Sequence, residues 1–147
     1  MSPADVSMFY GVFDIETAVD ESIKTANEKV LAIGEFKTLR ELTVVDLTAL
    51  PKEVSIWMDK WKAVSFLKSF HNDITRPLLN DAKEAIEHVP SHIFTEYLRW
   101  MFTYKKGRNI DGLMYRSCKT QKANVVLFCN NENSHKWLNL ENLSTRK

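Results

Sequence analysis

The residues best placed for chemistry lie in the last third of the chain. An Asp111-Gly112 turn leads into a short apolar stretch that ends on Arg116 and Ser117, and a second apolar stretch, 124–128, follows a polar loop. This pattern predicts two strands, 112–117 and 124–128. A serine at a strand end beside a basic residue could hold a phosphate or a sugar hydroxyl. Alternation along the strand, however, turns Arg116 to the opposite face.

Two further candidates lie near the N-terminus. Residues 7–13 are rich in aromatic and apolar side chains and predict a strand that carries Tyr10. Asp14 can cap a helix that follows to about residue 26. Its expected buried stripe is Ile15, Ala18, Val19, Ile23 and Ala26. Glu21 lies beside that stripe, where periodicity does not separate a catalytic carboxylate from a solvated one, and Tyr10 and Ser117 could equally be plain strand residues.

The elements that would position these residues suggest an α+β domain. Further strands are predicted at 30–33 and 42–47, joined through Gly34, and helical periodicity runs from 53 to about 89. Pro77 would start a new helix or a kink, and Pro90 would end this region. Ser91 would cap a last helix through residue 104, and the tail from residue 130 is polar. Strands at both ends with helices between them predict an α+β fold for one domain, 1–147.

The aromatic side chains of the helical region could be stacking surfaces, but their helical spacing favours a buried core. They are Trp57, Trp61, Phe94, Tyr97, Trp100, Phe102 and Tyr104. No basic stripe accompanies them, so we expect no direct nucleic-acid binding.

Composition and charge exclude several classes. The formal net charge is +1 for 147 residues, so no global field attracts nucleic acid or an anionic membrane. There is no apolar run of about 18 residues and no signal-peptide pattern, so we expect a soluble cytoplasmic domain. Cys118 and Cys129 are expected to be free thiols. Pro90 separates His88 from His92, the other histidines are isolated, and we therefore predict no metal site.

Together, two blocks of the sequence resemble the RES domain family, which is named for an arginine, a glutamate and a serine. The first block is Met1-Ser-Pro-Ala with Ser7-Met-Phe-Tyr-Gly11, followed by Glu16-Thr-Ala-x-x-Glu21. The second is Asp111-Gly-x-x-Tyr-x-Ser117 with Asn124-Val-Val-Leu-Phe128, plus Thr95-Glu-Tyr-Leu98 before it. The blocks lie at both ends of the chain, and the central helical region resembles nothing specific.

The resemblance implies a mixed sheet like that of ADP-ribosyltransferases, with a central helical region, and degradation of NAD⁺ at the nicotinamide–ribose bond. Inorganic phosphate or water would be the second reactant. By the same resemblance, Glu21 and Ser117 would be catalytic residues and Tyr10 would bind the nicotinamide. Family members are often toxins of toxin–antitoxin pairs, so an Xre-type antitoxin is a possible partner.

The sequence also departs from the family pattern. The family arginine normally precedes the segment that matches Met1-Ser-Pro-Ala, so we expect an N-terminally truncated member. Arg40, Arg76 and Arg99 match no family position. Because arginine is the natural clamp for a pyrophosphate, its loss would weaken dinucleotide binding. Two hypotheses stay open: an NAD⁺-degrading enzyme, and a catalytically impaired RES-like domain that binds a nucleotide or a protein.

Overall fold

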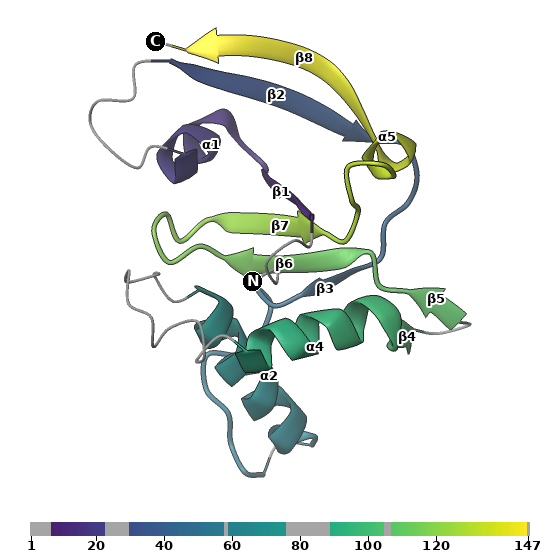
Figure 1. The fold of residues 1–147 in the computed structure, drawn as a ribbon. Coiled ribbons are helices and arrows are strands. Elements are labelled where there is room, and N and C mark those ends of the chain that lie inside the picture. Colours follow the sequence, from purple (N-terminus) through teal and green to yellow (C-terminus); the bar gives the residue numbers. More distant parts are fainter. Residues whose placement is uncertain (1–6, 23–29, 58, 76–88, 105–106, 147) are drawn as a thin grey trace.

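A four-stranded mixed sheet forms the centre of the computed structural model, which describes residues 7–22, 30–57, 59–75, 89–104 and 107–146 (Figure 1). The strands lie in the order β1 (Phe9–Val12), β7 (Ala123–Leu127), β6 (Gly112–Arg116) and β3 (Val44–Asp46). The pairs β1–β7 and β6–β7 are antiparallel, whereas β3 and β6 are parallel. The predicted α+β class and mixed sheet are confirmed.

Two helices, α2 (Trp61–Thr75) and α4 (Val89–Trp100), cover one face of this sheet (Figure 1). Leu113 of β6 and Val126 of β7 are fully buried there, and they belong to one cluster with Phe70 of α2 and Leu98 of α4. The rings of Phe70 and Phe94 meet edge to face with centroids 4.6 Å apart. Burial of this apolar surface is the main force that fixes the helices on the sheet.

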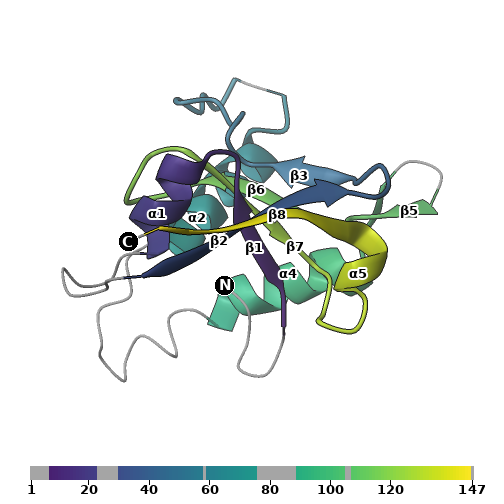
Figure 2. The same cartoon turned by 90° about the horizontal axis from the view of Figure 1, so that it is seen from above.

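A two-stranded antiparallel ribbon covers the other face (Figures 1 and 2). It consists of β2 (Leu31–Thr38) and β8 (Leu138–Arg146), with the short helix α5 (Ser134–Trp137) leading into β8. Leu127, Cys129 and Leu138 form the core between ribbon and sheet. The helix α1 (Ile15–Ser22) follows β1, and β4 (Thr103–Tyr104) pairs with β5 (Arg108–Asn109) beyond α4.

The sequence did not predict β8, because a bulge interrupts its alternation. Leu138 and Leu140 are spaced by two residues, as in a regular strand, but Leu143 follows after three. The register shifts between Glu35 and Phe36, whose partners are Asn142 and Leu140, so an extra residue stands in β8. Period-two reasoning therefore fails at this point. Gly34, expected between two strands, lies inside β2 opposite Leu143.

The expected aromatic core of the helical region is wrong in most of its members. Trp57 is 90% exposed and Trp100 is 69% exposed, while Trp61, Tyr97, Phe102 and Tyr104 are also exposed. Only Phe94 of this set packs against the buried cluster. The helices bury Phe70, Leu98 and Thr95 instead. Spacing shows that a helix has an apolar stripe, but the neighbouring sheet decides which part of it is covered.

The predicted boundaries also need correction. Helix α1 begins after Asp14, as expected, but its buried residue is Thr17 and Ile15 is exposed. Helix α4 begins at Val89, so Pro90 lies in its first turn, where the missing N–H costs little, and Ser91 is not the cap. It ends at Trp100, and Thr103–Tyr104 is a strand. Pro77, Ile23, Ala26 and His88 lie outside the described residues.

Candidate active site

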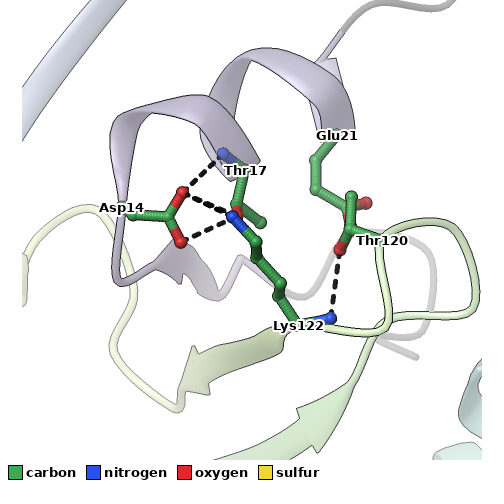
Figure 3. Close-up of polar contacts among 5 residues, drawn as sticks. All are labelled: Asp14, Thr17, Glu21, Thr120 and Lys122. Atoms are coloured by element: carbon green, nitrogen blue, oxygen red, sulfur yellow. Dashed lines mark hydrogen bonds and ion pairs between the residues drawn. The ribbon is translucent and has the colours of Figure 1, made fainter.

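The N-terminus of α1 is fixed by Asp14, which caps it as the sequence predicted. One carboxylate oxygen, Oδ1, accepts the backbone N–H of Thr17 at 2.8 Å, and the Thr17 hydroxyl donates to the same carboxylate at 2.8 Å (Figure 3). The backbone hydrogen bond from Thr17 is the main reason that the pKa of Asp14 lies below its ordinary value. Lys122 contributes to the same shift, with its Nζ 3.2 Å from Oδ1. The cap fixes the start of α1. Because the helix is short, its start also determines where the last turn carries Glu21.

The loop between β6 and β7 is shaped by Ser117. Its hydroxyl oxygen accepts the backbone N–H groups of Lys119 at 3.0 Å and Thr120 at 3.3 Å. The backbone N–H of Ser117 donates to the carbonyl of Lys122 at 2.9 Å. Ser117 is buried, at 5% exposure. In this structure the serine therefore closes a tight loop, and its contact with a phosphate stays a prediction.

Three contacts hold this loop against α1. The Thr120 hydroxyl donates to Oε1 of Glu21 at 3.0 Å, and Lys122 pairs with Asp14 (Figure 3). The ammonium group of Lys119 donates to the carbonyl oxygen of Asp20. Ser117 thus acts on Glu21 through Thr120, and the two residues that the family resemblance singled out are joined. Sequence reasoning missed Thr120, because 99 residues separate it from Glu21 and no local pattern links them.

Tyr10 faces the same region from β1. In antiparallel sheets, directly opposed residues point to one face. Tyr10 lies opposite Val126, and Asn124 lies opposite both Val12 and Tyr115. The side chains of Tyr10, Asn124 and Tyr115 therefore project from one face of the sheet, the face that α2 and α4 cover further along. Tyr10 is 48% exposed on the edge strand, whereas Asn124 is buried.

Tyr115 of β6 lies opposite Asn124 of β7. Burial raises the pKa of its phenol above the ordinary value, and a side-chain hydrogen bond from Asn124 acts in the opposite direction. Electrostatic interactions with Tyr10, Glu21 and Cys118 raise the pKa of Tyr115 further. The structure thus brings Tyr10, Glu21 and Ser117 to one corner and adds Thr120, Tyr115 and Asn124. A polar residue in a strand that is otherwise apolar, such as Asn124, was the signal available in the sequence.

The described arginines that match no family position are engaged elsewhere. Arg40 binds Asp111 with both terminal nitrogens, at 2.6 Å and 3.2 Å, and its guanidinium lies over the Trp137 ring at 4.2 Å. Arg99 pairs with Glu96 at 3.5 Å. Asp111 stands at the start of β6 and Ser117 at its end, so the Arg40 pair lies away from Glu21. Arg76 lies outside the described residues. The side chain of Arg116 reaches the carbonyl of Gln121 at 3.4 Å.

Two hollows lie outside this corner. One of about 440 Å³ is lined by β1 and ribbon residues that include Phe9, Phe36 and Cys129. The other, of about 370 Å³, surrounds Arg40 and Asp111. Neither includes Tyr10, Glu21 or Ser117.

The cysteines and the described histidines show no arrangement typical of a metal site or a second active site. Cys118 is exposed and Cys129 is buried, both free as expected, and burial raises the pKa of the Cys129 thiol. Nε2 of His71 accepts the backbone N–H of Arg116 at 3.3 Å. Within the ranges that the structure describes, no three His, Cys, Asp or Glu side chains gather as metal ligands would. None of the described helices combines the length and apolar character needed to span a bilayer.

Comparison with protein families gave a match. The family model described as "RES domain" matches residues 1–139, which include Tyr10, Glu21, Ser117 and the strands that carry or position them. Comparison with the curated proteins and with the solved structures gave no match. A match over nearly the whole chain shows the family, and this chain belongs to the RES domain family.

Proposed function

We propose that this RES domain degrades NAD⁺ at the nicotinamide–ribose bond, by phosphorolysis or hydrolysis. One observation carries the proposal: the Glu21 carboxylate is held by Thr120 at 3.0 Å, beside the phenols of Tyr10 and Tyr115. A fixed carboxylate next to aromatic rings suits a reaction that builds positive charge on a ribose and releases a flat aromatic ring. Such a reaction needs no metal ion, only well-placed negative charge.

Glu21 would stabilise the transition state. When the bond from C1′ of the ribose to the nicotinamide nitrogen breaks, its electron pair goes to that nitrogen and neutralises the pyridinium charge. Positive charge then grows on C1′ and the ring oxygen, as in glycoside hydrolysis. The Glu21 carboxylate can stabilise this charge and accept a hydrogen bond from a ribose hydroxyl. Water or phosphate then bonds to C1′, and a water nucleophile passes its proton to a base or to solvent.

Tyr10 and the loop would supply the binding contacts. The Tyr10 ring lies on an edge strand and is 48% exposed, so it can stack on the nicotinamide. The loop carries Lys119 and Lys122, both within reach of α1, and therefore adds positive charge near the corner. Such charge would favour the phosphates of a dinucleotide or an attacking inorganic phosphate. The Ser117 hydroxyl can add one donor to that phosphate.

The engagement of Arg40 and Arg99 favours the second hypothesis, a catalytically impaired domain that binds a nucleotide or a protein. Both guanidinium groups are held by carboxylates away from Glu21. A dinucleotide bound beside Glu21 would then not have these two arginines as a clamp for its pyrophosphate. The two hypotheses differ in whether the domain cleaves NAD⁺, and both assign binding to the corner of Tyr10, Glu21 and Ser117.

A toxin role in the cytoplasm follows if turnover is present, because loss of NAD⁺ would stop growth. An Xre-type antitoxin would then restrain the enzyme. Exposed apolar side chains on and beside α4, such as Ile93, Trp100 and Met101, offer a surface that a protein partner could cover.

The test is nicotinamide release from NAD⁺ by the purified full chain, with and without phosphate, followed by chromatography. We expect Glu21→Gln to lower the rate by about 100-fold or more, since it removes the charge that stabilises the transition state. Glu16→Gln is the matched control, an exposed carboxylate in the first turn of the same helix, and it should leave the rate unchanged. Equal release by the wild type and Glu21→Gln would contradict catalysis and leave the binding hypothesis.

A further inference from the structure

Asn124 carries a buried polar atom that needs a partner. Its residue is 8% exposed, and its Oδ1 oxygen accepts no hydrogen bond from any residue that the structure describes. Leaving a buried acceptor unpaired costs about 1–3 kcal/mol, so native proteins rarely keep one without a function. The oxygen lies on the face of the sheet that carries Tyr10 and Tyr115.

The partner of the Asn124 amide nitrogen identifies what this oxygen can bind. The side chain of Asn124 donates a hydrogen bond to the phenol oxygen of Tyr115, which is the bond that works against the raised pKa of Tyr115. Its NH₂ group is thereby engaged and its carbonyl oxygen is free to accept. The phenol oxygen of Tyr115 receives that bond, so its own O–H proton is directed elsewhere. The ordinary pKa of a tyrosine phenol is 10.0 and burial raises the pKa of Tyr115 above it, so the phenol is protonated at neutral pH and can donate.

The two side chains therefore offer one acceptor and one donor next to each other. A primary carboxamide, –CONH₂, has the opposite arrangement: an N–H donor and a carbonyl acceptor on one carbon. A carboxylate has two acceptors and no donor, so one of its oxygens would face the Asn124 oxygen without a hydrogen bond. An ester or a hydrocarbon would satisfy neither or only one of the groups.

We propose that Asn124 and Tyr115 form the subsite that binds the carboxamide of nicotinamide and rejects the carboxylate of nicotinic acid. This inference rests on the proposed function, because it assigns the nicotinamide end of NAD⁺ to this corner. Tyr10 covers the ring, the Asn124–Tyr115 pair orients its amide, and Glu21 faces the ribose. Sites that hydrogen-bond a substrate group discriminate strongly against analogues that lack it, because their own buried groups are left unpaired.

The test measures binding of the free bases, which needs no turnover. Nicotinamide and nicotinic acid are titrated into the full chain and followed by ligand-observed NMR. We expect the wild type to bind nicotinamide at least about tenfold more tightly than nicotinic acid. Tyr115→Phe removes only the donor, and Asn124→Leu removes the acceptor. Each should weaken nicotinamide binding about tenfold, whereas Asn124→Leu should not weaken nicotinic acid binding, because it removes the oxygen that one carboxylate oxygen would face.

The control is Asn139→Leu, the same substitution at an exposed position on β8. Thermal unfolding of each variant checks folding, and Tyr115→Phe keeps the ring if Asn124→Leu fails to fold. No binding by the wild type up to about 10 mM nicotinamide, or equal affinity for both bases, would overturn the inference. Selective nicotinamide binding without cleavage of NAD⁺ would overturn only catalysis. Equal cleavage of NAD⁺ and its nicotinic acid analogue would overturn only this subsite.

Discussion

A carboxylate lies beside each end of strand β6, Asp111 before its start and Glu21 of α1 near the loop that follows it, and the two have different partners. At the start of β6, Asp111 binds Arg40 with both oxygens and also accepts the backbone N–H of Thr43 at 2.8 Å. Its own backbone is bonded to Thr43 and Phe128. At the far end, Glu21 is held by Thr120, and the neighbouring Asn124 has a buried oxygen without a partner among the described residues.

This difference separates a structural network from a chemical one. Hydrogen-bonding capacity that is already satisfied inside the protein stabilises the fold and offers little to a ligand. A buried donor or acceptor without a partner lowers stability, and it contributes favourably only when a ligand supplies that partner. We therefore expect substitutions at the Asp111 end to change the free energy of unfolding, and substitutions at the Glu21 end to change binding or turnover.

The largest effect on stability is expected for Asp111→Ala. It leaves the Arg40 guanidinium and the Thr43 N–H without their partner, and we expect the free energy of unfolding to fall by about 3 kcal/mol. Urea denaturation measures this change. Glu141→Ala, which removes an exposed ion pair with Lys37 at 3.6 Å, is the control and should change stability by less than about 0.5 kcal/mol. If Asp111→Ala altered the KM of the remaining folded enzyme, the Asp111 end would belong to the site as well.

A smaller effect, on turnover, is expected for Thr120→Val. The variant keeps the shape of the side chain and removes the hydroxyl that positions Glu21. We expect kcat to fall about tenfold while KM changes little, because Thr120 does not contact the substrate. Thr120→Ser restores the hydroxyl and should recover most of the rate. A purely structural role would instead give parallel losses of stability for Val and Ser, with kcat of the folded protein unchanged.

The smallest effect concerns pH and Asp14. Its pKa in the folded protein is lowered from 3.8, mainly by Thr17, so the stability that it contributes is present above that ordinary value and is lost as pH falls through the lowered pKa. Asp14→Asn should therefore lower stability near neutral pH, where the ionised carboxylate contributes, and flatten the fall of stability below about pH 4. Thermal unfolding between acidic and neutral pH measures this. The comparison is Asp46→Asn, which replaces an exposed carboxylate outside the site. If Asp14→Asn lost stability at acidic pH just as the wild type does, the role assigned to Asp14 would be contradicted.

Local patterns predicted the elements whose cause is local. The Asp14 cap depends on residues three positions apart, and β1, β6 and β7 are short apolar runs with turn residues between them. Each was predicted within a few residues of its observed bounds. The β8 strand was missed because a bulge changes its period at the third leucine. The expected burial of Trp57 and Trp100 was wrong: their side chains are 90% and 69% exposed, and the Trp100 ring contacts the Arg99 guanidinium of its own helix instead of the sheet.

The residues of the candidate site also divide into those that the sequence predicted and those that it did not. Tyr10, Glu21 and Ser117 were proposed from the order of motifs along the chain, and the family match over 1–139 supports the family to which those motifs point. Thr120, Tyr115 and Asn124 were not proposed as site residues. Their importance depends on cross-strand register and on a loop that contacts a helix 99 residues away.

The sequence by itself determined the α+β class, the capped start of α1, the strand pair predicted at 112–117 and 124–128, and the family. These follow from side-chain periodicity, turn residues and motif order, which are properties of neighbouring residues. The tertiary structure alone decided that Ser117 contacts Thr120, which binds Glu21, and that Arg40 is held by Asp111. It also decided that the Asn124 oxygen is buried without a partner among the described residues. Those outcomes depend on which distant groups satisfy one another's hydrogen bonds, and that is settled only when the sheet and its loops are brought together.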